Sequence, residues 1–256
     1  MMARFLVFCY VAPLMAFGDV APGERRVGVD RPTRSGLVGL LAAALGLRRE
    51  DPRQDALARS VAFAARTDAP GRATVDYHTT QTAPAKRNRR FATRRDELAV
   101  DDLGTILSQR AYVEDAAFTV VALVDDGGPF SVDEIGAALA KPRFALHAGR
   151  RACPLGLPPA ARVVEAGSLG AAFAAYDAEQ ASQSDRAALL EAFRRRGQSR
   201  NECAVDSRFE TLALLDGFKA LRREVRRDDP ASRVRWQFAP RERIVGRLET
   251  QARASP

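Results

Sequence analysis

The segment from Pro32 to Arg49 constrains the fold more than any other stretch, because it marks both ends of a helix. From position 37 onwards, apolar side chains recur at the i, i+3, i+4 and i+7 spacing that gathers them on one helical face. Ser35 suits the N-cap, and Gly46 suits the left-handed position after the last turn. The pattern predicts a helix over residues 35–45.

The start of this helix has the composition of an anion site. Thr33, Arg34, Ser35 and Gly36 would bring together backbone N–H groups, a cation and the positive end of the helix dipole. Gly36 also leaves room for a bound backbone to approach closely. The plain alternative is a core helix with incidental arginines, since capped amphipathic helices are common.

Charge favours a polyanionic partner. The chain of 256 residues has a formal net charge of +8, and 37 of its 40 basic residues are arginine. Arginine pairs phosphate through a planar fork and stacks on bases, so nucleic acid is the favoured polyanion. A GC-rich coding sequence would also raise arginine and alanine together, so charge alone does not decide the partner.

The cysteines and the apolar runs indicate the cellular compartment of the protein. Cys9, Cys153 and Cys203 are far apart and odd in number, which predicts no disulfide framework and no metal site and favours a reducing cytoplasm. The apolar run at 4–12 is rich in β-branched and aromatic residues and stops at Pro13, as expected of a buried strand. A secretory signal peptide is the alternative for this run. No stretch reaches the roughly 18 apolar residues that a membrane span needs.

The order of elements predicts an α+β fold. Strands are expected at 4–12, 61–66, 116–124 and 144–149, and helices at 35–45 and 131–140. Ser131 and Glu134 form a capping box at the start of the second helix. The resulting βαββαβ order is that of ferredoxin-like domains, an arrangement shared by RNA-recognition modules. We expect this domain to occupy residues 1–150.

A long excursion separates the second and third strands. We expect residues 74–113 to form a thumb-like β-hairpin, which carries the dense basic run from Lys86 to Arg90. Two interpretations stay open for this run. It is either a solvated, partly disordered loop or a basic arm that orders on nucleic acid.

Residues 151–256 are expected to form a smaller, mostly β domain. Helices are expected at 168–176 and 185–196, two strands or a helix at 210–227, and a pair of strands at 233–248 that carries Trp236, Phe238, Arg241 and Arg243.

Catalytic motifs are missing from the sequence. It contains no Gly-x-Ser-x-Gly, no Walker-type loop and no His-Glu-x-x-His, so we expect neither a cofactor nor a catalytic metal. His147 lies among apolar residues, as core or edge histidines do. His78 lies beside Tyr77 in a basic region, which leaves acid–base chemistry on RNA as an alternative. The paired acids Asp228 and Asp229 are expected in a solvated turn.

Five blocks of sequence occur in order across residues 4–154. They are Pro13–Gly18, Pro32–Gly46, Asp76–Thr79, Arg110–Phe118 and Gly149–Pro154. Together they resemble the CasD family, the subtype I-E form of the Cas-five subunit of the CRISPR surveillance complex Cascade. The resemblance continues weakly through residues 236–243, and residues 177–218 have no counterpart in it.

The resemblance implies a non-catalytic subunit that caps one end of the complex. Such a subunit grips the repeat-derived 5′ handle of the CRISPR RNA and kinks it with a thumb-like hairpin. The resemblance also implies contacts with the backbone subunit and the large subunit of Cascade, and with target DNA through the assembled complex in antiviral defence.

The resemblance and the side-chain chemistry together give a set of candidate RNA-binding residues. Arginines are expected to pair phosphates, backbone N–H groups to add uncharged contacts, and aromatic rings or histidine to stack on a splayed base. The set consists of Arg26, Thr33, Arg34, Ser35, Gly36, Tyr77, His78, Arg110, Tyr112, Arg150 and Arg151.

Two other functions stay open. One is a CRISPR repeat endoribonuclease that processes precursor RNA, with Tyr77, His78 and Lys86 as its candidate groups. The other is a free-standing RNA-binding regulator, which would behave as a stable monomer without large exposed apolar surfaces.

Overall fold

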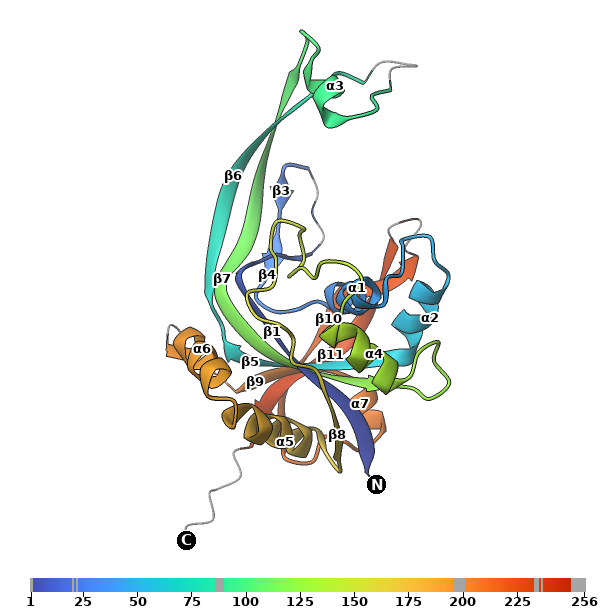
Figure 1. Cartoon of the computed structure of the whole chain (residues 1–256), viewed down its shortest axis with the longest axis vertical. Coiled ribbons are helices and arrows are strands. Elements are labelled where there is room, and N and C mark those ends of the chain that lie inside the picture. Colours follow the sequence, from blue (N-terminus) through green and yellow to red (C-terminus); the bar gives the residue numbers. More distant parts are fainter. Residues whose placement is uncertain are drawn as a thin grey trace.

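The computed structural model describes residues 2–19, 21, 23–85, 90–195, 201–232, 235 and 237–249, with only the backbone of residues 184, 186 and 193–195. One sheet runs through the described chain (Figure 1). Its main path is β10 (Phe218–Ser232), β11 (Gln237–Leu248), β9 (Glu202–Asp206), β5 (Val61–Ala69), β7 (Gly104–Val124), β1 (Ala3–Met15) and β8 (Arg162–Ala166). Every neighbouring pair on this path is antiparallel.

Strand β1 is the buried central strand that the apolar run predicts, and it continues past Pro13 to Met15. Successive side chains of a strand point to opposite faces, so the side chains of β1 pack in two separate cores. Leu6, Phe8 and Tyr10 pack in the core that contains helices α1 (Arg34–Leu45), α2 (Arg53–Ser60) and α4 (Val132–Ala140). Phe5 and Val7 pack in the core that contains α5 (Leu169–Ala181) and α7 (Arg208–Thr211). The sheet therefore carries helices on both faces.

The helix predicted at 35–45 is present as α1, but it begins one residue earlier and its N-cap is Thr33, not Ser35. The Thr33 backbone is extended, and its hydroxyl accepts a hydrogen bond from the Gly36 N–H at 3.2 Å. Gly46 ends the helix with a φ of +77°, as expected. Helix α4 carries the expected capping box of Ser131 and Glu134. Within the described residues, no helix is long and apolar enough to cross a membrane.

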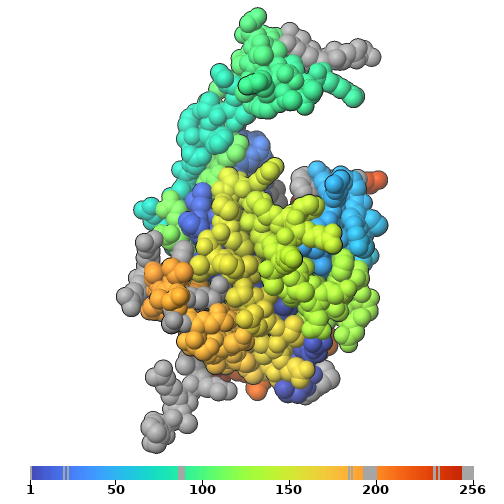
Figure 2. Space-filling view, in the orientation of Figure 1, coloured from blue at the N-terminus to red at the C-terminus, as the bar shows by residue number. Residues whose placement is uncertain are grey.

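A long hairpin projects from the body of the molecule (Figure 2). It is formed by β6 (Arg72–Thr82) and the first half of β7, paired from Arg72 opposite Glu114 to Thr82 opposite Gly104. The short helix α3 (Arg94–Leu98) lies near its tip (Figure 1). The expected hairpin is confirmed, while residues 86–89 of the basic run lie outside the described residues.

The prediction of a strand at 144–149 is wrong. This segment makes one isolated bridge, between His147 and Pro154. Its beginning instead caps α1, because the Phe144 N–H donates to the carbonyl of Ala43. The next strand in the chain after β7 is β8, which pairs with β1.

Strands from both sides of the expected boundary at residue 150 belong to this sheet. After it, β8 pairs with β1, β9 pairs with β5, and β11 pairs with β9. The region 210–227 holds the end of α7 and most of β10, and β11 is one strand rather than two. The helices expected at 168–176 and 185–196 are present as α5 and α6 (Ser184–Arg195). The division of the chain into two domains stays a prediction.

The three cysteines are buried, and none of them forms a disulfide within the described structure. Burial raises the pKa of the Cys203 thiol to about 12 and also raises that of Cys153. At pH 8 a thiol with that pKa is ionised in roughly one molecule in ten thousand, and the thiolate is the reactive form. We expect the folded protein to react far more slowly than the urea-unfolded protein with a chromogenic disulfide reagent. Fast labelling of all three thiols in the folded protein would contradict this burial.

Candidate nucleic-acid interface

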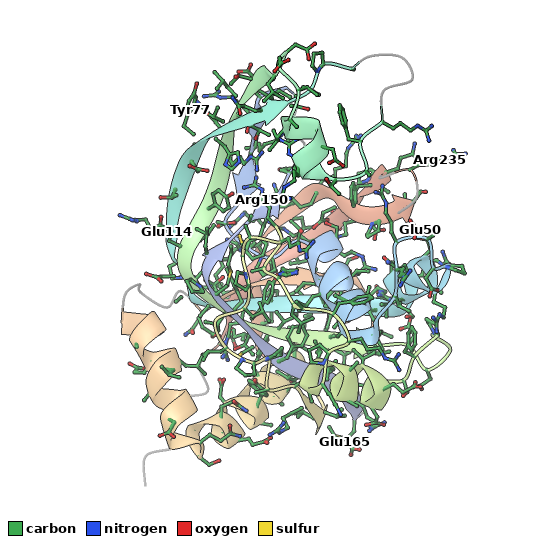
Figure 3. The ribbon with its side chains drawn as sticks, turned by 45° about the horizontal axis from the view of Figure 1, so that its top comes forward. Glu50, Tyr77, Glu114, Arg150, Glu165 and Arg235 are labelled. Carbon is green, nitrogen blue, oxygen red and sulfur yellow. The ribbon has the colours of Figure 1, made fainter. Side chains whose placement is uncertain are left out.

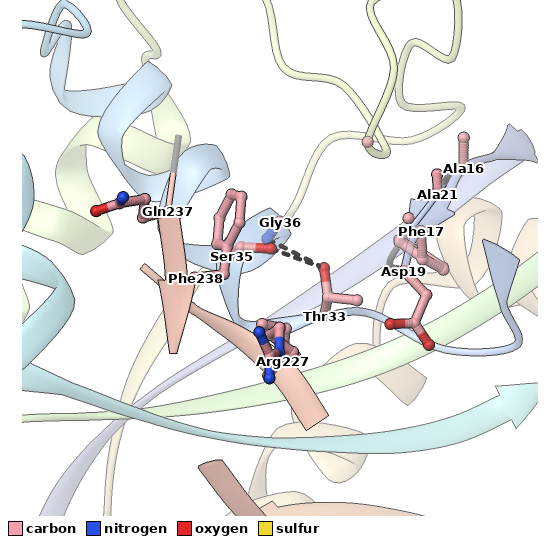
Figure 4. A pocket seen from close by; sticks show the side chains of 13 residues that line it. Ala16, Phe17, Asp19, Ala21, Thr33, Ser35, Gly36, Arg227, Gln237 and Phe238 are labelled. Atoms are coloured by element: carbon pink, nitrogen blue, oxygen red, sulfur yellow. Dashed lines mark hydrogen bonds between the residues drawn. The ribbon is translucent and has the colours of Figure 1, made fainter. Parts of the chain in front are cut away.

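A groove of about 880 Å³ opens at the start of α1 (Figure 4). Three of the expected residues, Thr33, Ser35 and Gly36, line it, and Gly149 lies in its wall. The other walls come from Ala16, directly after β1, from β2 (Phe17–Gly18) and the residues that follow it, and from β10 and β11. The groove therefore combines segments from the beginning, the middle and the end of the chain.

The anion position at the start of α1 is already occupied by a carboxylate of the protein. The Asp228 side chain accepts a hydrogen bond from the Arg34 backbone N–H at 2.8 Å. The Gly36 N–H is taken by the Thr33 hydroxyl. The negative charge that the helix dipole favours is thus supplied from within the fold, where the sequence predicts a phosphate.

Arg34 is a structural arginine, not the phosphate ligand that the sequence predicts. It is only 6% exposed. Its guanidinium pairs with Asp206 at 3.1 Å and with Asp229 at 2.7 Å. It also donates to the carbonyls of Val61, at 2.8 Å, and Ala58. These bonds tie α1 to β5, β9 and β10 and leave the side chain buried away from the solvent.

A β-bulge in β10 explains where its charged residues point. The register with β11 shifts between Arg226 and Asp229, which leaves Arg227 and Asp228 unpaired in the ladder. Asp228 is buried and also accepts from Arg241 at 2.8 Å, so the expectation of a solvated acid pair is wrong. Arg227 is exposed and lines the groove. The bulge therefore leaves Arg227 exposed while Asp228, the next residue, is buried.

From the sequence, Phe17, Arg227 and Gln237 are not expected in the site, and Phe238 is expected only as a strand residue. All four line the groove (Figure 4). Phe17 belongs to the first block of the family resemblance, which is the one local signal for it. Arg227 and Gln237 have no such signal, because the register shift in β10 and the pairing of β11 with β10 place them.

Two arginines of β11 are also drawn into the fold, Arg243 fully and Arg241 partly. Arg243 is 3% exposed and pairs with Glu224 at 2.6 Å. Burial lowers the pKa of the Arg243 guanidinium, and the ion pair with Glu224 opposes that change. Arg243 and Arg241 consequently hold the β10–β11 pair together.

Gly149 and Arg150 connect the groove with the hairpin. Gly149 has a φ of +88° and lies so close to β1 that an added Cβ would be 1.8 Å from the Ala16 carbonyl oxygen. The next residue, Arg150, donates to the carbonyl of Ala111 at 3.2 Å and places its guanidinium carbon 4.6 Å from the centre of the Tyr112 ring. Figure 3 shows Arg150 between the body and the hairpin.

The hairpin has two faces of different chemistry. Directly paired residues share a face, so His78, Arg110 and Tyr112 lie on one face. Tyr77 lies on the other face, is 62% exposed and points away from the body (Figure 3). The three expected stacking groups, Tyr77, His78 and Tyr112, therefore do not converge on one base.

The remaining expected arginines lie on the side of the molecule that carries the hairpin base. Arg26, in β3 (Arg25–Arg26), is exposed and pairs in the ladder with Arg110 of β7. The Arg110 side chain donates to the Ser108 hydroxyl at 3.1 Å. Arg151 is exposed beside Arg150.

Catalytic groups do not gather in the described part of the chain. His78 Nδ1 lies 3.2 Å from Asp76 Oδ2 on the exposed hairpin. Among the described residues, no group of three or more His, Cys, Asp and Glu side chains could hold a metal ion.

Comparison with known proteins gives a consistent assignment. Residues 5–244 match the family model described as CRISPR-associated protein (Cas_Cas5). The chain is 35% identical over 167 residues to the CRISPR system Cascade subunit CasD of Escherichia coli (strain K12), covering 61% of this chain and 70% of that protein. The fold is similar to a chain of a CRISPR RNA-guided surveillance complex, with a TM-score of 0.56 and 24% identity over 98% of this chain and 95% of that one. A crystal structure of a Cas protein gives a TM-score of 0.55 and 22% identity over 97% and 100% of the two chains. The chain therefore belongs to the Cas5 family of CRISPR-associated proteins.

Proposed function

We propose that this protein is a non-catalytic subunit of a subtype I-E Cascade complex that binds and caps the 5′ handle of the CRISPR RNA. The observation that carries the proposal is the junction of groove and hairpin. Gly149 lines the groove, and Arg150 stacks on Tyr112 of the hairpin. One RNA strand would thus pass from the groove onto the hairpin base. The relationship to CasD supports this role.

The charges of the groove suggest how the strand lies. Arg227 and Asp228 belong to the wall formed by β10, and Asp19 belongs to the wall that follows β2. Carboxylates repel phosphates, so the RNA backbone follows Arg227, Arg150 and Arg151 while bases enter the groove. Phe17 and Phe238 offer aromatic surface for a base, a contact of roughly 1 to 3 kcal/mol that tolerates different bases.

We further infer a ferredoxin-like core for this subunit. The strand order β8-β1-β7-β5, with α1 and α4 in the two crossovers, supports the inference. The β9, β10 and β11 strands extend that core on the β5 side.

The outer face of the hairpin suits contacts with other subunits. Val75 and Tyr77 lie on it and are 67% and 62% exposed. Exposed apolar residues that gather on one face mark interaction surfaces. We propose that this face meets the backbone or the large subunit, and that target DNA is reached through the assembled complex.

The decisive experiment is affinity purification of the tagged chain from its own host, followed by sequencing of the RNA that accompanies it. We expect short RNAs with one uniform, repeat-derived 5′ end, together with several copurifying proteins. Heterogeneous RNA, or a soluble monodisperse protein that binds unrelated hairpins equally well, would favour a free-standing RNA-binding regulator.

We expect Arg227→Ala to weaken handle binding several-fold without changing thermal unfolding, because the side chain is exposed at the groove. The slope of log affinity against log salt should fall by about 0.7, the value for one phosphate contact on a single strand. Arg59→Ala removes the same charge from the exposed surface of α2 and is the matched control. Equal effects of both variants would mean that only net charge matters.

An endoribonuclease is the rival function, since His78 is paired with Asp76. Tyr77 lies on the opposite face of the hairpin from His78, which separates two of its three candidate groups. We expect no metal-free cleavage of repeat RNA. Cleavage that disappears in His78→Ala would establish the rival.

A further inference from the structure

We propose that the open edge of the hairpin joins two copies of this chain into a symmetric dimer, in which β6 pairs antiparallel with β6 of the second copy. The strand lies on the side of the hairpin that faces away from the body, with β7 between it and β3 (Figure 1). Among the described strands, β6 pairs with β7 alone, so its outer edge presents backbone N–H and C=O groups to which another strand can pair. The inference concerns the chain by itself and does not depend on the proposed handle binding.

The other edges in the described part of the sheet carry features that prevent such pairing. Edge strand β10 has three register shifts, a row of exposed basic side chains and Pro230. Bulges, charges and proline all disfavour pairing with a further strand. Strand β8 has only five residues and packs beside α4 and α5. On the inner side of the hairpin, β3 covers part of β7. Within the described chain, β6 is therefore the long edge strand that lacks this protection.

Strand β6 is regular and suited to pairing. It pairs with β7 at eleven successive positions without a register shift, and none of its residues is buried. Its sequence, RATVDYHTTQT, is rich in β-branched residues and contains neither proline nor lysine. The charge of Arg72 is already paired with Glu114. Near the tip, Arg94 donates to the Gln81 carbonyl, so the central residues 74–80 would carry the pairing of two copies.

The side chains of β6 favour one register. In a symmetric antiparallel pair within a continuous sheet, the residue at the two-fold axis lies opposite its own copy. Tyr77 is the centre of the strand, so an axis there pairs the most residues. It places the Asp76 carboxylate opposite His78 of the second copy and the two tyrosine rings opposite each other. An axis at Asp76 would instead oppose two carboxylates, and like charges directly opposite each other destabilise a sheet. An axis at His78 would oppose two imidazoles.

The same register gathers exposed apolar surface. Val75 and Tyr77 lie on one face of β6 and are 67% and 62% exposed. In the dimer, Val75 lies opposite Thr79 of the second copy, beside the two tyrosines. These side chains form one strip across the two hairpins, and their contact removes part of it from water. The backbone edge and the side chains therefore favour the same partner, a second copy of this chain.

The test is sedimentation-velocity analysis of the full-length protein over a range of concentrations. Nuclease treatment beforehand ensures that bound nucleic acid does not bridge two chains. We expect a reversible equilibrium between monomer and dimer.

The diagnostic variant is Tyr77→Lys, which places two like charges at the two-fold axis and removes the aromatic pair. We expect its dimer affinity to fall at least about tenfold. Gln109→Lys is the matched control, because Gln109 is exposed on the same face, directly beside Tyr77 in β7. It adds the same charge away from the axis, where salt screens it, and should leave the affinity within about threefold. Both variants should keep the unfolding midpoint of the unsubstituted protein, because the replaced side chains are exposed.

Disulfide cross-linking locates the axis. In Tyr77→Cys the two new thiols would face each other, within the distance that a disulfide spans. In Gln109→Cys they would be separated by three strand spacings, about 14 Å, which no disulfide spans. Because the native cysteines are buried, mild oxidation should give a covalent dimer of Tyr77→Cys but not of Gln109→Cys.

Three results would overturn the proposal. The first is a protein that stays monomeric at the highest concentration at which it remains soluble. The second is a dimer that Tyr77→Lys and Gln109→Lys weaken equally or not at all, which would place the contact on another surface. The third is equal cross-linking of the two cysteine variants, which would show random collision instead of a defined register.

Discussion

Replacing Arg34 with methionine is expected to lower the free energy of unfolding by about 3 to 5 kcal/mol. The guanidinium is buried, and its loss leaves Asp206 Oδ2 and the carbonyls of Ala58 and Val61 without this donor. Asp206 Oδ1 keeps its hydrogen bond from the Arg208 backbone N–H at 3.1 Å. Arg241 approaches Asp206 only to 3.9 Å and does not replace the lost pair. Breaking one side of a buried ion pair is costly because the remaining charge stays desolvated.

Urea unfolding followed by circular dichroism measures this effect. Arg227→Ala removes an exposed arginine from the groove and should change stability by less than about 0.5 kcal/mol. If Arg34→Met were as stable as Arg227→Ala, and bound RNA more weakly, Arg34 would be the phosphate ligand that its sequence context predicts.

Replacing Gly149 with alanine is expected to destabilise the protein by about 3 kcal/mol or more. The positive φ of this residue is strained for any side chain, and the new Cβ would collide with the Ala16 carbonyl at the end of β1. Backbone on both sides must move to relieve the collision. Because Gly149 lines the groove, RNA binding should fall together with stability.

Gly18→Ala is the matched control for this substitution. Gly18 lines the same groove, but nothing lies within 4 Å of a Cβ added there and its φ is not positive. We expect its unfolding midpoint to match that of the unsubstituted protein. A similar loss in both variants would show that the groove tolerates no added methyl group, whatever the backbone conformation.

Features encoded by neighbouring residues could be predicted from the sequence. The apolar run at 4–12 specifies a strand buried on both faces, and the pattern from position 37 to Gly46 specifies α1. The capping box of α4 depends on two residues three positions apart and was also predictable. In each case the determining interactions lie within a few residues.

Features set by distant contacts could not be predicted in this way. The acid that occupies the start of α1 comes from Asp228, 194 residues further along the chain. The segment 144–149 has the composition of a strand, but the end of α1 captures its beginning. The presence of Arg110 and Tyr112 on the face of His78 depends on the register between β6 and β7, which neighbouring residues do not specify.

The carboxylate of Asp228 has a consequence for the modularity of the protein. Asp228 of β10 accepts from the first backbone N–H of α1, and Arg34 of the same helix pairs with Asp206 of β9. A fragment that ends near residue 150 would retain α1 and the hairpin but would lose Asp206, Asp228 and Asp229, the carboxylates that pair with the start of α1. A shortened chain would not form the groove, because β10 and β11 supply part of its walls.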